Sequence, residues 1–101
     1  MVATLYLPNY APCIVPTDGL SLPSPRGYAQ VPSAVAGFLG CIQELVDVLD
    51  CGTDYVAYSI FDCEGATNRL AMDALSAVSG HTYDAENEDQ KLQGPILVVT
   101  R

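Results

Sequence analysis

Two short segments in the second half of the chain carry side chains suited to chemistry. The first is Asp62-Cys63-Glu64-Gly65, where a predicted strand meets a predicted helix. Backbone N–H groups and the helix dipole at such a position can stabilise the thiolate of Cys63. The flanking carboxylates of Asp62 and Glu64 oppose thiolate formation. The alternative is structural, with Asp62 capping the helix and Glu64 serving as an acid of its first turn.

The second segment, His81-Thr-Tyr83-Asp84, holds the only histidine of the chain. An imidazole, a phenol and a carboxylate this close together could act as base, proton donor and orienting group. A histidine next to Gly80 at a helix end is also favoured there by the helix dipole, which is a structural explanation. One hypothesis is therefore a small enzyme or small-molecule binder that uses Cys63, His81, Tyr83 and Asp84 at the carboxyl ends of the strands.

A different reading follows from a group of acids with no base among them: Glu44, Asp47, Asp50 and Asp54. At the end of a predicted helix, Asp47 and Asp50 each oppose the dipole at a cost of a few tenths of a kcal/mol. This cost suggests a partner with a basic surface, and the alternative is a solvated acidic face. Tyr10 and Tyr28 in the proline-rich segment could add aromatic contacts to a partner, or could cover the edge of the core.

The charge balance restricts the partner further. The 101 residues include 12 acids and 4 bases, for a net charge of −8. An average domain is about a quarter charged with both signs represented, so the acids are ordinary in number and the bases are scarce. This scarcity argues against direct nucleic-acid binding and against an anionic membrane surface, since both need basic side chains.

Several features indicate a cytoplasmic protein without cofactors. The amino terminus has no basic segment and Pro8 interrupts its apolar run, so no targeting signal is predicted. No segment is apolar over enough residues to span a bilayer. The chain contains no glycine-rich phosphate or dinucleotide motif and no nucleophile elbow. The cysteines have no zinc-ligand spacing, and we expect reduced structural thiols and no metal at Cys13, Cys41, Cys51 and Cys63.

The elements that must position these residues follow from residue periodicity. Residues 2–7 alternate in residue type as a strand does, and Pro8 ends this strand. The prolines and glycines of 8–32 exclude a helix there. Within that segment, only residues 13–15 could pair as a short edge strand. Apolar residues recur at helical spacing over 33–49, from Ser33 behind Pro32 to a stop at Cys51-Gly52. A strand over 54–61, a helix over 63–79 that ends at Gly80, and a buried strand over 95–99 follow.

These elements predict an α/β fold in one domain, residues 1–101. The expected architecture is a small single-layer β-α-β-α-β sheet of three to four strands, parallel in the middle around the 95–99 strand, with two helices. Residues 1–32 supply the first strand and a long, ordered, proline-rich loop, and residues 33–101 supply helix, strand, helix and strand. About a dozen residues separate the helices, which leaves room for a single strand.

The first predicted helix also carries a smooth strip, Ala36, Gly37 and Gly40. Each glycine costs about 1 kcal/mol relative to alanine inside a helix, so we expect a close backbone approach there. The approach would be to the chain's own sheet or, alternatively, to a second copy. Homodimerisation through this strip or through a sheet edge is therefore a secondary hypothesis.

Of the two functional readings, binding is favoured. The chain has one histidine, no recognised catalytic motif and little volume beyond its core for a deep pocket. We predict a small acidic binding or regulatory module that contacts a basic partner protein through Glu44, Asp47, Asp50, Asp54, Tyr10 and Tyr28.

Overall fold

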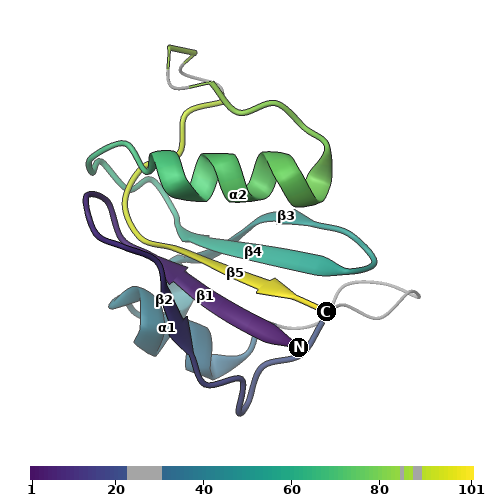
Figure 1. The fold of residues 1–101 in the computed structure, drawn as a ribbon. Helices are drawn as coiled ribbons and strands as arrows, with labels where there is room; N and C mark the ends of the chain where they lie inside the picture. The colour runs from purple at the N-terminus through teal and green to yellow at the C-terminus, as the bar shows by residue number, and fades with distance from the viewer. Residues whose placement is uncertain (23–30, 85, 88–89) are drawn as a thin grey trace.

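The computed structural model describes residues 1–22, 31–84, 86–87 and 90–101. In chain order the elements are β1 (Val2–Tyr6), β2 (Cys13–Val15), α1 (Ser33–Leu39), the 3₁₀ turn η1 (Gln43–Leu45), β3 (Val46–Cys51), β4 (Tyr55–Ile60), α2 (Arg69–Ser79) and β5 (Ile96–Thr100). The five strands form one sheet in the order β2-β1-β5-β4-β3, and every neighbouring pair is antiparallel. Helix α1 lies on one face of the sheet and α2 on the other (Figure 1).

The predicted three- to four-stranded β-α-β-α-β sheet is wrong in strand number and direction, although the fold remains a small mixture of helices and strands. A helix between two strands normally carries the chain across to a parallel neighbour. Here α2 runs about 16 Å at 1.5 Å per residue, and the loop 80–95 returns to the end where β4 finished. Ser59 therefore pairs with Ile96, and Tyr55 with Thr100. The 95–99 segment is the central strand, as predicted, but its neighbours are antiparallel.

The helix predicted over 33–49 ends ten residues early. Gly40 adopts the left-handed conformation at φ 76°, and its N–H donates to the Ala36 carbonyl, which closes the last turn of α1. The chain then forms η1 and β3. The residues between α1 and α2 consequently supply two strands where one was predicted. This extra strand moves the acids from a helix end onto the edge of the sheet.

The second predicted helix begins at Arg69, six residues later than expected. Asp62, the predicted cap, has φ 54°, which is not the extended conformation of an N-cap residue. The cap is Asn68, whose side chain accepts from the Ala71 N–H. The end at Gly80 is confirmed, with φ 76° and its N–H bonded to the Ser76 carbonyl.

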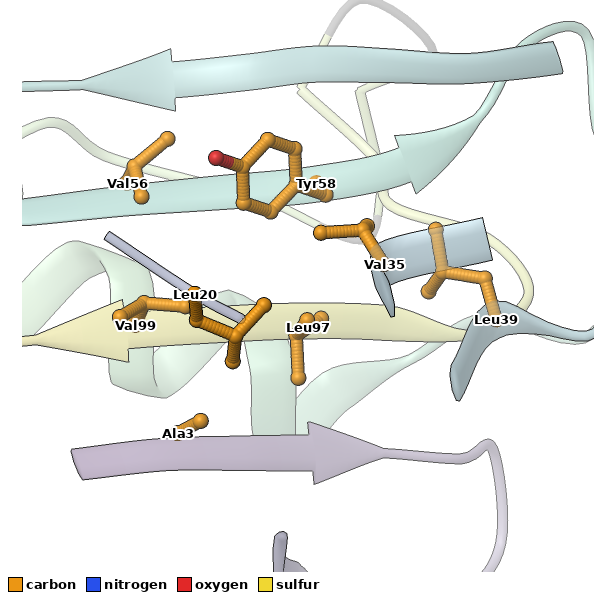
Figure 2. Close-up of a cluster of buried hydrophobic side chains, with 8 residues drawn as sticks. All are labelled: Ala3, Leu20, Val35, Leu39, Val56, Tyr58, Leu97 and Val99. Atoms are coloured by element: carbon orange, nitrogen blue, oxygen red, sulfur yellow. The ribbon is translucent and has the colours of Figure 1, made fainter. Parts of the chain in front are cut away.

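Both faces of β5 are buried, as the sequence predicts. Leu97 and Val99 face α1, whereas Ile96 and Val98 face α2. Figure 2 shows the α1 side, where Val35 and Leu39 of the helix meet Leu97 and its neighbours. The sheet is therefore the middle of three layers, and α2 packs mainly on β4 and β5.

The proline-rich segment is partly described. β2 pairs with β1 as an edge hairpin, as predicted, and Leu20, Leu22 and Val31 pack against the α1-side core. The prediction that the loop is ordered throughout 8–32 includes residues 23–30, which lie outside the described residues, as does Tyr28.

One buried side chain ties three distant parts of the chain together. The amide nitrogen of Asn68 donates to the carbonyls of Tyr6 (2.9 Å) and Gly94 (2.8 Å), while its oxygen accepts from the Ala71 N–H (3.3 Å). The Asn68 N–H also donates to the Leu92 carbonyl at 2.8 Å. Asn68 is 1% exposed, so its amide is shielded from water.

The glycine strip does not mediate a close approach to the sheet. Gly37 is exposed, and a Cβ added there would meet no described atom within 4 Å, whereas Gly40 is needed for its positive φ. We predict that Gly37→Ala stabilises the fold by about 1 kcal/mol through helix propensity, and that Gly40→Ala destabilises it by about 1 kcal/mol. Urea unfolding measures both. A destabilised Gly37→Ala variant would show that this glycine is required for packing.

Asn68 offers a sharper test because its roles can be separated. Asn68→Ala should cost about 2–4 kcal/mol, since it removes the helix cap and leaves two shielded carbonyls without donors. Asn68→Asp keeps an acceptor for the Ala71 N–H but directs a carboxylate at the carbonyls of Tyr6 and Gly94. We expect Asn68→Asp to lose at least as much stability as Asn68→Ala in urea unfolding. Near-native stability of Asn68→Asp would mean that only the cap matters.

Candidate functional site

The structure divides the four predicted partner-binding acids into two groups. Asp50 on β3 is turned inward, with a side chain 15% exposed, and Asp54 pairs with Arg101, whose Nε lies 3.0 Å from its Oδ1. Glu44 in η1 and Asp47 on β3 are exposed, and neither forms an ion pair within the described residues. Glu44 and Asp47 are therefore the two of these four acids that are both exposed and unpaired within the described residues.

Asp50 is the centre of a polar cluster on the α2 side of the sheet. Its Oδ2 accepts from the Tyr55 hydroxyl at 3.1 Å and from the Tyr83 hydroxyl at 3.3 Å, and it lies 3.4 Å from Nδ1 of His81. A β-bulge between Val48 and Asp50 sets this geometry by pairing Asp50 with Ala57, whose side chain faces α2. The bulge thus aims the carboxylate at the loop that follows α2.

His81 is held by the end of α2. The Ser79 hydroxyl donates to the Leu75 carbonyl at 2.6 Å and accepts from the His81 N–H at 3.1 Å. The imidazole side chain is 67% exposed and turns Nδ1 toward Asp50. The ring therefore lies beside a carboxylate, which is the relative placement of a base and an orienting group.

The two tyrosines act as hydrogen-bond donors over a wide pH range. Burial, the negative charge of Asp50 and the hydrogen bond to Asp50 together raise the pKa of Tyr83 to about 12. Burial first, and then the hydrogen bond and charge of Asp50, raise the pKa of Tyr55. Both phenols therefore keep their protons at neutral pH, and the Asp50 carboxylate accepts from both.

The enzymatic candidates do not converge on one place. His81 and Tyr83 join Asp50, whereas the Asp84 side chain accepts from the Glu86 N–H at 2.9 Å. Cys63 packs beneath Gly94 and lines a cavity of about 360 Å³ whose lining includes neither His81 nor Tyr83. Among the described residues, no three His, Cys, Asp or Glu side chains are placed to hold a metal ion.

Tyr10 lies at the opposite edge of the sheet from the acids. It follows β1 and lines a cavity of about 520 Å³ with Leu7, Arg69 and Leu70. β2 and β3 are the two ends of the strand order, so Tyr10 and Asp47 lie toward opposite edges of the sheet.

A surface at the β3 edge combines acidic and apolar side chains. We call it the β3-edge surface; it consists of Glu44, Asp47, Ile42, Leu45, Val48 and Phe61, all exposed. Ile42 and Phe61 are more than 60% exposed, and the Phe61 N–H donates to the Leu45 carbonyl at 2.7 Å. Sequence reasoning missed these apolar residues because a helix over 33–49 would bury Ile42 and Leu45. The valines flanking Asp47, with Gly40 upstream, were the available signal for a strand.

Tyr55 was also missed as a site residue, since it was assigned only to a strand face.

Within the part of the chain that the structure describes, no helix is long and apolar enough to cross a membrane. Comparisons with models of protein families, with curated proteins and with solved structures found no match to this chain.

The raised pKa of Tyr83 predicts alkaline sensitivity. The folded state holds this proton more tightly than the unfolded chain, whose tyrosines ionise near pH 10. The contribution of Tyr83 to stability is therefore complete below about pH 10 and is lost as the pH rises toward about 12. In urea unfolding between about pH 8 and pH 11, the wild type should lose more free energy of unfolding than Tyr83→Phe.

The matched control is Tyr10→Phe, because Tyr10 is 69% exposed. This variant should follow the pH dependence of the wild type. If Tyr83→Phe and Tyr10→Phe lose equal stability at high pH, the bond between Tyr83 and Asp50 does not hold the phenol proton in solution.

Proposed function

We propose that this protein is a cytosolic binding module that receives a basic partner protein on the β3-edge surface. The observation that carries the proposal is the exposure of four large apolar side chains beside two unpaired acids at the open edge of a sheet. Several exposed apolar side chains close to charged ones are typical of protein-interaction sites.

Charge and apolar area have separate roles in this proposal. With a net charge of −8 and 4 bases, the chain attracts cationic surfaces at long range, which speeds association and discriminates between partners. Ile42, Leu45 and Phe61 supply area that gains about 25 cal/mol per Å² when it is removed from water. The partner is thus expected to have lysine or arginine around an apolar contact.

The thiols support a reducing compartment. All four cysteines are free, and Cys13 and Cys51 are exposed. Exposed unpaired thiols persist in the cytosol, whereas they are oxidised in secretory compartments.

The competing readings have less support. The enzymatic residues fall into separate places, and the Asp50–His81 pair has no convergent nucleophile among the residues described as contacting it. A second copy docked on the β3-edge surface would bring Glu44 and Asp47 against their own like charges. A heterologous basic partner satisfies both the charge and the apolar features.

Charge reversal tests the proposal. We predict that Glu44→Lys with Asp47→Lys weakens capture of basic proteins from lysate about tenfold, whereas Asp18→Lys with Asp73→Lys, at exposed positions elsewhere, leaves it near wild type. Both pairs change net charge equally, so the comparison isolates position from overall charge. Captured proteins are quantified at increasing salt, which should release them from the wild type. Equal loss in both pairs, or no loss in either, would contradict the proposed surface.

A further inference from the structure

We infer that the partner adds a short strand to the outer side of β3 and that this strand alternates basic and apolar side chains. The inference rests on the proposed function and specifies how the partner is recognised. Among the described residues, no segment pairs with the outer side of β3. Strand addition of this kind takes affinity from main-chain hydrogen bonds and specificity from alternate side chains.

The main chain of β3 presents the required groups. The Leu45 carbonyl accepts from the Phe61 N–H and so faces β4, whereas the Leu45 N–H donates to the Ile42 carbonyl. In an antiparallel pair, successive residues alternately direct their N–H and C=O groups toward and away from the neighbouring strand. The N–H and C=O of Val48 and the C=O of Val46 therefore point away from β4. The Val46 N–H already donates to the Gln43 carbonyl. Three main-chain groups are therefore available within three residues.

The side chains of β3 define the pattern of the added strand. Val46 and Val48 are paired with Ile60 and Tyr58 on the α1 side, whereas Asp47 is paired with Ser59 on the α2 side. Side chains on neighbouring strands contact each other when they lie on the same face. A strand added to β3 thus places apolar residues beside Val48 and a lysine or arginine beside Asp47.

The two edges of the sheet differ in their capacity for this addition. β2 has three residues, and Pro12 and Pro16 flank it, which limits pairing at that edge. On β3 the bulge after Val48 ends regular pairing, so the receptive length is short. Asp47 opposes pairing with a second copy, since antiparallel self-addition would bring two carboxylates together.

The test uses two eight-residue peptides of identical composition. One alternates lysine and valine, and the other places four lysines before four valines. We expect the alternating peptide to bind at least tenfold more tightly in a fluorescence titration, and to slow hydrogen exchange of the Val48 amide. Glu44→Lys with Asp47→Lys should weaken both peptides, while Asp18→Lys with Asp73→Lys should weaken neither.

The outcomes distinguish the two proposals. Equal binding of both peptides, with weakening by Glu44→Lys and Asp47→Lys but unchanged exchange at Val48, would overturn strand addition and leave the basic-partner function standing. Binding of neither peptide at about 1 mM would overturn both. Tighter binding of the alternating peptide with exchange slowed at Val48 supports strand addition.

Discussion

The fold depends on the amide of Asn68, which satisfies main-chain groups from three segments at once. Its nitrogen bonds the end of β1 at Tyr6 and the approach to β5 at Gly94, and its oxygen caps α2. A buried amide whose hydrogen bonds are all made specifies one arrangement of these segments, because moving any of them would leave a main-chain carbonyl without its donor. The start of α2 is therefore fixed relative to the central strands, which determines where the far end of the helix lies.

At that far end, a second polar centre connects α2 to the edge of the sheet. The turn after Gly80 delivers His81 and Tyr83 to Asp50, and Tyr55 reaches the same carboxylate oxygen from β4. These contacts hold β3 to the segment that follows α2, and they supplement the single strand neighbour of β3, which is β4. Asp50 thus fixes β3 on the α2 side of the sheet, and the edge of β3 away from β4 has no strand neighbour among the described residues.

Sequence reasoning identified the elements whose signals are local. The alternating strand 2–7, the buried strand 95–99 and the glycine stop at Gly80 needed only neighbouring residues. The start of α2 was misplaced because Asp62 has the residue type of a cap, while Asn68 acts through carbonyls of residues far along the chain. The grouping of Asp50 with Tyr83 spans 33 residues. It depends on the return of the chain after α2, and spacing alone does not reveal this return.

The bulge in β3 has a consequence for how the chain tolerates changes in length. On a regular strand, residues three apart face opposite sides, yet Asp47 and Asp50 both face α2 because Leu49 is the extra residue between them. Two acids three residues apart thus share one side of a strand. Deleting Leu49 would leave Asp47 and Asp50 two residues apart on a regular strand, so both would still face α2, but it would remove the Leu49 side chain that packs against the α2-side core. The direction of the two acids therefore tolerates the loss of this residue, whereas the packing on the α2 side does not.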